Sequence, residues 1–300
     1  MKIARLIRPV PQWSAVGIAP PQRSISVHLS WKGESRDVTD DHSVASLKPL
    51  TIALGLDAGE EATLDFREDG RSLGTLRLTK SRSILAGPSP VTLYRIAAGE
   101  HRCLPRPIRN WQRWLQERAA KRNRAEHNFR MEPAALLQLM ICYICPRPVV
   151  LVSVAAAGHF NIFPMDLIGS VGNGFALALR STNISIPIMR RERRLVLSSL
   201  PAGMKPAAYA LGEHHKAPLR ELAALPFATR PSPLWGIASV AAALRTRELL
   251  IRHVEEVGSH TLFLADILFD EPLAQGAQLH HISGFYHCHR QQRGIAFPDA

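Results

Sequence analysis

The chain has 300 residues, a formal net charge of +12 and a sequence pI near 10.2. Hydrophobic residues make up 46% of it, which is enough for a sizeable core in one large domain or two ordinary ones. Four cysteines are too few for a disulfide framework, and the positive charge favours anionic partners such as phosphate-bearing cofactors, nucleic acid or acidic membrane surfaces.

The sequence contains no recognisable membrane or secretory segment. The N-terminal stretch MKIARLIRPVPQW lacks the apolar core of a secretory signal. The longest apolar candidate, residues 134–157, is interrupted by Pro146, Arg147 and Pro148 before it reaches the roughly 18–20 residues of a membrane helix. We therefore expect a soluble, cytoplasmic protein without a membrane partner.

Residues 1–105 are predicted to consist mainly of strands. SISVHLSW (24–31) alternates between polar and apolar side chains, as a half-buried strand does. ATLDFREDGRSLGTLRL (62–78) contains two alternating runs around EDGRS, which is a strong hairpin signal, and VTLYRIA (91–97) predicts another strand. No catalytic cluster is evident here, so we expect a small β-rich accessory domain of unknown role.

A basic segment follows and predicts a helix over residues 106–127. Trp111 and Trp114 are three residues apart and therefore share a helix face. A basic helix with aromatic side chains could bind nucleic acid or an anionic membrane. We prefer a connecting helix whose tryptophans dock on a domain while its arginines face water, which makes residues 106–130 the predicted inter-domain linker.

The remaining residues, 131–300, predict a short helix over 131–140 and then strands with helices inserted between them. PRPVVLVSVAAAGHFNIFPMDLIGSV (146–171) predicts two strands around a turn at 157–159. Further strands are predicted at FALALRS (175–181), at RRLVLSSL (193–200) and on both sides of Gly258. This spacing suits a closed barrel rather than βαβ units.

Common catalytic motifs are missing from the sequence. GSVGNG (169–174) is glycine-rich but is not a dinucleotide-binding fingerprint, so we predict a hairpin turn. There is no P-loop, no G-x-S-x-G and no H-E-x-x-H. Cys142 and Cys145 form a CxxC, but no second pair completes a zinc site and the motif runs into a predicted strand, which favours two core thiols.

Two histidine-containing segments could hold a metal, but another interpretation is preferred for each. RDVTDDHS (36–43) places three aspartates beside His42, yet the carboxylates are unspaced and no distant ligand joins them, which predicts a solvated loop. HHISGFYHCHR (280–290) would place His287 and His289 on one face of a strand. Its glycine and its position near the end favour an edge segment or a subunit contact, so no metal site is predicted.

From residue 133 to about 290 the chain resembles the flavin reductase-like family, which binds FMN in a split β-barrel. Four segments carry the resemblance in order: 146–171, RSTNISIPI (180–188), LPFATRPSP followed by RELLIRHVEEVGSHTLFLADI (225–267), and HHISGFYH (280–287). The resemblance implies a mainly β fold, with an FMN-binding split β-barrel and inserted helices over 131–300, preceded by the β-rich domain over 1–105. Such barrels usually form homodimers with FMN at the subunit interface.

The resemblance also implies where FMN would bind. The phosphate would be held by the guanidinium, hydroxyls and backbone N–H groups of Arg180, Ser181 and Thr182, with Ser185 as a further donor. The flavin ring would lie against a segment that comprises Asn161, Pro164, Met165, Asp166, Leu167 and Ser170. Hydride transfer through the flavin belongs to the cofactor, so no side-chain nucleophile is required.

His260, in the junction GSHTLF, is the candidate catalytic residue. By resemblance it would hydrogen-bond the nicotinamide reductant or steer its charge. Alternatively, it caps a strand by bonding a neighbouring carbonyl. The chain departs from the family at Asp166 and at Ser259, where Gly-Asp-His is usual. Beside the ring, Asp166 would disfavour the reduced, anionic flavin, or else it points to a basic partner.

The leading hypothesis is an FMN-binding oxidoreductase of the flavin reductase type that takes hydride from NAD(P)H. It would supply reduced flavin to a partner oxygenase or reduce a small substrate itself. The alternative is a flavin-binding or sensing protein without reductase turnover. RRERR (190–194) would meet dinucleotide phosphates or form a solvated face. Nucleic-acid binding ranks last, because a charge of +12 over 300 residues needs no nucleic acid to explain it.

Overall fold

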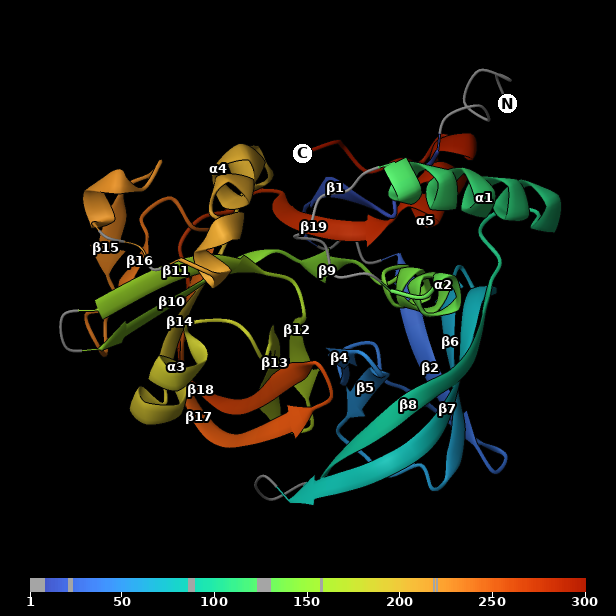
Figure 1. Cartoon of the computed structure of the whole chain (residues 1–300), viewed down its shortest axis with the longest axis horizontal. Helices are drawn as coiled ribbons and strands as arrows, with labels where there is room; N and C mark the ends of the chain where they lie inside the picture. The colour runs from blue at the N-terminus through green and yellow to red at the C-terminus, as the bar shows by residue number, and fades with distance from the viewer. Residues whose placement is uncertain are drawn as a thin grey trace.

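The computed structural model describes residues 9–20, 24–85, 90–122, 131–156, 159–217, 219 and 221–300. Strands dominate these residues, which confirms the prediction of a mainly β protein. They form two seven-stranded antiparallel sheets side by side, one three-stranded sheet and one two-stranded sheet (Figure 1). In this part of the chain, no helix is both long and apolar enough to span a membrane.

The first seven-stranded sheet lies within residues 25–101. Its strand order is β3-β2-β6-β7-β8-β5-β4. The hairpin predicted around EDGRS is confirmed, since Asp69 and Gly70 both have positive φ, as a tight two-residue hairpin turn requires. The strands are β2 (Ile25–Trp31), β3 (Glu34–Asp37), β4 (His42–Leu47), β5 (Leu50–Leu54), β6 (Glu61–Glu68), β7 (Arg71–Leu85) and β8 (Pro90–His101).

The second seven-stranded sheet lies within residues 150–272, in the order β11-β10-β14-β17-β18-β13-β12. The turn predicted in GSVGNG is confirmed, because Val171 pairs with Gly174 across it. Of the turn predicted at 157–159, residues 157 and 158 lie outside the described part. The strands are β10 (Val150–Ala156), β11 (His159–Met165), β12 (Ile168–Val171), β13 (Gly174–Arg180), β14 (Arg194–Ser199), β17 (Arg245–Val257) and β18 (His260–Pro272).

Gly258 joins β17 to β18 at the end of this sheet, as predicted. Its φ of +58° is a conformation that side-chain-bearing residues rarely adopt. A Cβ atom there would also lie 2.2 Å from the carbonyl oxygen of Lys48, in the turn between β4 and β5. The glycine therefore serves two purposes, because it closes the hairpin and lets the other half of the chain approach.

The two helices predicted from the sequence lie where they were expected. Those predicted over 106–127 and 131–140 are present as α1 and α2, with residues 123–130 outside the described part. Trp111 and Trp114 stack on each other with ring centroids 4.8 Å apart and are 46% and 43% exposed, and their docking on a domain stays a prediction. The helices are α1 (Arg106–Arg122), α2 (Pro133–Cys142), α3 (Ile186–Glu192), α4 (Lys205–Ala210) and α5 (Gly284–Gln292), with 3₁₀ turns η2 (Ala202–Met204), η3 (Gly212–His215) and η4 (Leu222–Ala224).

The C-terminal histidine segment corrects a prediction. Only its first part is a strand, β19 (Gln278–Ser283), which pairs with β1 (Trp13–Ile18) and with β9 (Arg147–Pro148). His287 and His289 lie on α5 instead of on a strand, because the chain turns into a helix at Gly284. A side chain at Gly284 would lie 1.8 Å from the carbonyl oxygen of Pro11, so glycine lets the helix start against the N-terminal segment. The two-stranded sheet consists of β15 (Thr229–Pro231) and β16 (Ala238–Val240).

One apolar cluster connects the two large sheets. It contains Phe66 and Tyr94 from the first sheet, Leu262 from the second, and residues of α2. Strand β4 packs against β12, β13 and β18, in the middle of the view in Figure 1. The division into residues 1–105, 106–130 and 131–300 stays a prediction, and the pairing of β1 with β19 joins its first and last parts.

Candidate functional site

The antiparallel pairing of β13 with β18 brings three predicted site residues together. Arg180, the last residue of β13, lies opposite His260, the first residue of β18. The backbone N–H of Ser181 donates to the carbonyl oxygen of Ser259 at 3.1 Å. The loop that begins at Ser181 and the junction before β18 are therefore held side by side, although they are far apart in the sequence.

Hydrogen-bond donors at this place converge on a carboxylate of the chain itself. The Thr261 hydroxyl donates to both carboxylate oxygens of Glu256, at 3.2 and 3.1 Å. The Ser181 hydroxyl donates to the same carboxylate at 3.4 Å, and the Arg190 guanidinium forms an ion pair with it. Two hydroxyls and a cation around one anion are the donor set that a phosphate group also uses. We call Ser181, Thr261, Arg190 and Glu256 the anion cluster.

The two other residues predicted to bind the phosphate, Thr182 and Ser185, lie at different places. Thr182 follows Ser181 and is exposed. Ser185 is buried and accepts from the Asn161 side chain at 2.8 Å, so two predicted residues meet there. Asn161 also donates to the carbonyl oxygen of His214 at 2.8 Å. These bonds fix the start of α3, whose last turn carries Arg190. Asn161 and Ser185 thus support the helix that positions Arg190.

His260 is buried at the contact between the two halves of the chain. Its side chain is 1% exposed, and its Nδ1 accepts from the backbone N–H of Leu47 at 3.4 Å and lies 2.9 Å from the Ser259 hydroxyl. Burial, and then the charge of Arg180, lower the pKa of His260 to about 4. The imidazole is therefore neutral near pH 7 and does not supply a positive charge to a reductant.

The segment predicted to face the flavin ring does not present one continuous wall. Met165 and Leu167 are both buried, but they belong to different apolar clusters. Pro164 lies opposite Leu151 in the pair of β10 with β11 and is partly buried. Ser170 is exposed on β12, opposite Phe175. Of these residues, Ser170 offers a side chain to a ligand in the present arrangement.

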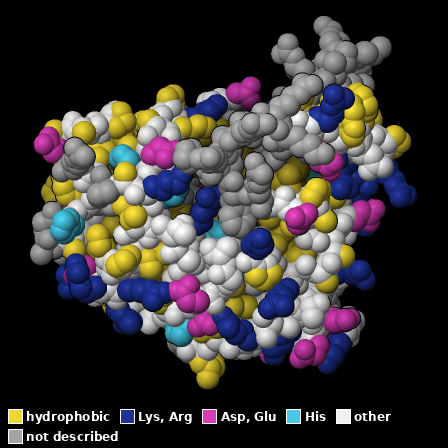
Figure 2. Space-filling model, viewed as in Figure 1, with side chains coloured by type: hydrophobic (Ala, Val, Ile, Leu, Met, Phe, Trp, Pro, Cys, Tyr) yellow, Lys and Arg dark blue, Asp and Glu magenta, His cyan; other side chains and the backbone are white. Residues whose placement is uncertain are grey.

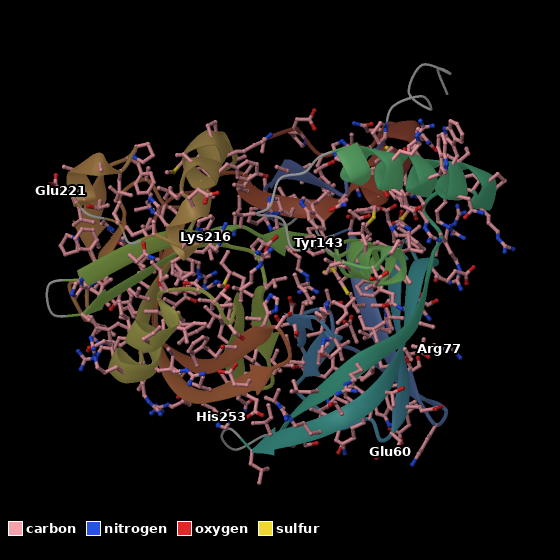
Figure 3. The ribbon with its side chains drawn as sticks, in the orientation of Figure 1. Glu60, Arg77, Tyr143, Lys216, Glu221 and His253 are labelled. Carbon is pink, nitrogen blue, oxygen red and sulfur yellow. The ribbon has the colours of Figure 1, made fainter. Side chains whose placement is uncertain are left out.

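Asp166 points to a basic partner, the second of the two alternatives considered for it. Its carboxylate accepts from His281 Nδ1 at 2.7 Å and from the hydroxyl of Tyr143 at 2.9 Å. Tyr143 lies in the middle of the molecule, as Figure 3 shows. The other ring nitrogen of His281 lies 2.8 Å from the Tyr209 hydroxyl. These residues form a continuous hydrogen-bonded row from a half-exposed phenol to a buried one.

The ionisation of Asp166 follows from this row. Burial raises the pKa of a carboxyl group, but the hydrogen bond and charge of His281, the hydrogen bond of Tyr143 and the charge of Arg147 outweigh it, so the pKa of Asp166 is lowered. Burial, and then Asp166, raise the pKa of Tyr143 well above its usual value. Asp166 is therefore the anion of the row, and Tyr143 stays neutral.

The remaining candidates for chemistry, Cys142 and the segment around Asp41 and His42, are engaged in contacts within the fold. Cys142 is buried at the end of α2, and burial raises the pKa of its thiol to about 12, so a thiolate is disfavoured. Asp41 accepts from the backbone N–H of Gly172 at 2.6 Å, while His42 is buried and its Nδ1 lies 2.7 Å from the carbonyl oxygen of Val38. Within the described ranges, no group of three or more His, Cys, Asp or Glu residues is arranged to hold a metal ion.

About half of the chain is similar in structure to flavin reductases and FMN-binding proteins. The NADH:FAD oxidoreductase of Streptomyces globisporus matches with a TM-score of 0.44 and 19% identity, over 53% of this chain and 95% of its own. The flavin reductase component of a bacterial two-component tryptophan halogenase matches with 0.44 and 16%, over 49% and 93%.

An FMN-binding protein of Thermus thermophilus matches with a TM-score of 0.40 and 19% identity, over 45% of this chain and 81% of its own. No protein-family model and no curated protein matches the chain. The resemblance found in the sequence and these structural similarities concern the same group of proteins.

The sequence did not predict several residues of the anion cluster and of the hydrogen-bonded row around Asp166. Glu256 and Thr261 lie within the segment 225–267 that resembles the family, but they acquire their role from strand pairing, since they are Cα partners across β17 and β18. Arg190 belongs to RRERR, for which the sequence predicts a contact with dinucleotide phosphates or a solvated face, and its partner in the structure is Glu256. Tyr143 follows α2, Tyr209 lies on α4 and His281 lies on β19. A correct strand register for β17 and β18 would have placed Glu256 opposite Thr261. No local sequence pattern indicated the hydrogen-bonded row around Asp166.

Proposed function

We propose that the chain is an FMN-binding oxidoreductase of the flavin reductase type, which takes hydride from NAD(P)H and uses FMN as its cofactor. The observation that carries the proposal is the anion cluster. It lies at the loop that the resemblance assigns to the flavin phosphate, and its hydroxyls and guanidinium already surround an oxyanion. The Glu256 carboxylate is here a stand-in for the phosphate.

The residues present fit a phosphate group. Ser181 and Thr261 supply neutral hydroxyl donors, and Arg180 and Arg190 supply positive charge. The Glu256 side chain is 55% exposed, so it can turn into solvent when a more highly charged anion arrives. A phosphate monoester carries a larger negative charge than a carboxylate and has three acceptor oxygens, which favours the exchange.

FMN, when bound, supplies hydride transfer chemistry of its own. The protein's part is to bind and orient it. Arg180, Ser181 and Thr182 would hold the phosphate, and the neutral His260 would keep the junction before β18 in place through Leu47. The anion of Asp166 is held by His281 and Tyr143, so its charge is partly balanced before any cofactor binds. NAD(P)H would be the reductant, and a partner oxygenase or a small substrate would accept the electrons.

One observation favours the second candidate, a flavin-binding or sensing protein without reductase turnover. The candidate catalytic residue, His260, is 1% exposed and its Nδ1 is engaged by Leu47 and Ser259. A side chain so enclosed has no open face for a nicotinamide. Binding through the anion cluster does not depend on that face.

Among the described residues on the face that Figure 2 shows, basic side chains give no comparable support to nucleic-acid binding. Figure 2 shows Lys and Arg side chains spread over the visible face with Asp and Glu among them. Several arginines form ion pairs with acidic neighbours, for example Arg245 with Asp270 and Arg252 with Asp266. A nucleic-acid site usually has unneutralised cations gathered on one face.

The deciding experiment is the visible absorption spectrum of the purified protein after FMN has been added and the excess removed. NADH and then NADPH are added without oxygen. A retained flavin band that bleaches with a nicotinamide supports the oxidoreductase. A retained band that does not bleach supports the binding or sensing protein. If no flavin band is retained and no NAD(P)H is consumed during titration with free flavin, both candidates are contradicted.

A further inference from the structure

The two large sheets have the same topology. Numbered by their order along the chain, the strands of each sheet are arranged second, first, fifth, sixth, seventh, fourth and third. In the first sheet this is β3-β2-β6-β7-β8-β5-β4, and in the second it is β11-β10-β14-β17-β18-β13-β12. Because many orders are possible for seven strands, the agreement suggests a common plan rather than two unrelated sheets.

The irregularities of the two sheets coincide as well. The long sixth and seventh strands of each sheet contain two register shifts. In both sheets the first shift places the extra residue on the seventh strand, Ala97 or Leu268. In both, the second shift places it on the sixth strand, Ser81 or Arg252. Bulges are positional features of a fold, so their coincidence sets a residue-by-residue correspondence between the sheets.

The correspondence set by the bulges extends to the core. Through the strand registers, many buried apolar residues of one sheet fall on buried apolar residues of the other, although some core positions differ, such as Leu76 with Arg247 and Phe66 with Ser199. Six of the matched pairs illustrate the correspondence, and every member of these six is no more than 4% exposed. The pairs are Leu29 with Val152, Ala53 with Ala176, Leu54 with Leu177, Leu64 with Leu197, Leu78 with Leu249 and Leu93 with Leu264.

The two halves also meet through corresponding elements. The third strand of one sheet, β4, packs on the third strand of the other, β12. Ser43 and Gly169 correspond in register, and a Cβ at Gly169 would lie 3.5 Å from the Cβ of Ser43. At the ends of the two sixth strands, Arg82 pairs with Glu255 at 2.5 Å. Contact between like positions is the property of an interface with two-fold symmetry.

We propose that residues 25–101 are a diverged second copy of the fold of residues 150–272, and that this copy takes the place of a partner subunit. The homodimer that the resemblance implies is then contained in one chain, with its flavin site beside the contact between the two copies. This inference rests on the proposed function for the flavin, but the duplication itself rests only on topology, register and contacts.

The first copy contributes to the surroundings of the anion cluster. The Arg82 guanidinium donates to the carbonyl oxygen of Glu256 at 2.7 Å. The carbonyl oxygen of Lys48 accepts from the N–H of Ser259 at 2.8 Å. Both contacts hold the hairpin end that carries Glu256 and Thr261. The cluster in the second copy is therefore built against the first copy, as a site at a subunit interface would be.

A symmetric pair of copies would have two such sites, but the first copy has lost its donors. When the strand registers are extended residue by residue, Asp57 corresponds to Arg180, Ala58 to Ser181, and Pro90 to Thr261. Asp57 is held by Lys80 at 2.6 Å, and hydrogen bonds from Lys80 and Gly59 lower its pKa, so it stays ionised. An anion replaces a cation, and neither hydroxyl remains, so phosphate is repelled there. The chain should hold one FMN.

The test measures the mass of the full chain in solution and its FMN stoichiometry. Light scattering after size exclusion should give one chain, 33.2 kDa, and titration should give one FMN per chain. Arg180→Asp should weaken FMN binding at least about tenfold, because it removes one charge-assisted contact and adds repulsion. The matched change in the first copy, Asp57→Arg, should leave the affinity unchanged.

Each outcome decides one part of the proposal. A mass of two chains would overturn the built-in partner, and two FMN molecules per chain would overturn the loss of the second site. Weaker FMN binding in Asp57→Arg would overturn the assignment of the site to the second copy. No FMN binding at all would contradict the proposed function and the single site, while a one-chain mass would then still support the built-in partner.

Discussion

Arg180 lies opposite His260 across β13 and β18, and its charge adds to burial in keeping that imidazole neutral. This pair marks the point where the second copy, the first copy and the anion cluster meet. Ser181 continues from Arg180 towards Glu256, and His260 reaches Leu47 of the first copy. The pair therefore connects the candidate phosphate site to the contact between the two halves.

Replacing Arg180 and Thr182 together with alanine should weaken FMN binding by about 2–4 kcal/mol, because each charge-assisted contact contributes roughly 1.5–3 kcal/mol and the two overlap. Quenching of flavin fluorescence measures the affinity. Arg36→Ala, on the exposed strand β3, is the control for a lost positive charge. An unchanged affinity in the double variant would remove this loop from the site.

Replacing Glu256 with glutamine should strengthen FMN binding, since the carboxylate no longer competes with the phosphate for Ser181, Thr261 and Arg190. The ion pair between Glu256 and Arg190 is exposed, so the gain in binding free energy should stay within about 0.2–1 kcal/mol, up to roughly fivefold in affinity. The same titration at low and high salt measures it. Glu192→Gln, which loses its pair with Arg191, is the matched control. Weaker binding in the Glu256 variant would show that this carboxylate does not stand in for a phosphate.

Acid should destabilise the fold through His260. Its pKa is lowered from 6.5 to about 4 in the folded protein, so below pH 6.5 the unfolded chain binds the proton first and stability falls as the pH falls. Between pH 7 and 5 this histidine accounts for a loss of about 2 kcal/mol. Urea unfolding of His260→Gln at both pH values should show a correspondingly smaller loss than the parent chain.

Four other histidines, His42, His101, His280 and His289, also have lowered pKa values and act in the same direction, so a residual loss remains in the variant. His28→Gln, on β2, is the control for replacing a histidine elsewhere. An identical pH dependence in the parent and the His260 variant would contradict the buried, neutral state of His260.

Replacing Glu68 with alanine should lower the free energy of unfolding by about 3–5 kcal/mol without changing FMN affinity. This carboxylate is 1% exposed and is held by Arg290 and Arg293, at 2.6 Å each, and by the Tyr286 hydroxyl at 2.8 Å. Its removal leaves the Arg290 guanidinium, whose side chain is 11% exposed, without its anion, whereas Arg293 is 42% exposed and can be solvated. Chemical denaturation measures the loss. An unchanged stability would show that the contact between β6 and α5 does not hold the C-terminal helix to the first sheet.

The hairpin around Asp69 and Gly70, the turn before Gly174 and the helix that ends at Cys142 were predictable from the sequence. Each depends on neighbouring residues, because alternation, turn chemistry and glycine conformation act over a few positions. The same local signals misjudged residues 284–292. Their histidines suit a strand as well as a helix, and contact with Pro11, far away in the sequence, decides where α5 begins.

The sequence by itself determined the strand-rich class of the protein, most of its strands and the loop of Arg180, Ser181 and Thr182. Only the tertiary structure decided that Glu256 and Thr261 face that loop, that Asp166 pairs with His281, and that the first half repeats the topology of the second. These relationships depend on strand register and on packing between distant segments. A fold tolerates many exchanges of apolar side chains at a buried position, such as Leu29 for Val152, so it can persist after the sequence similarity of two copies has faded.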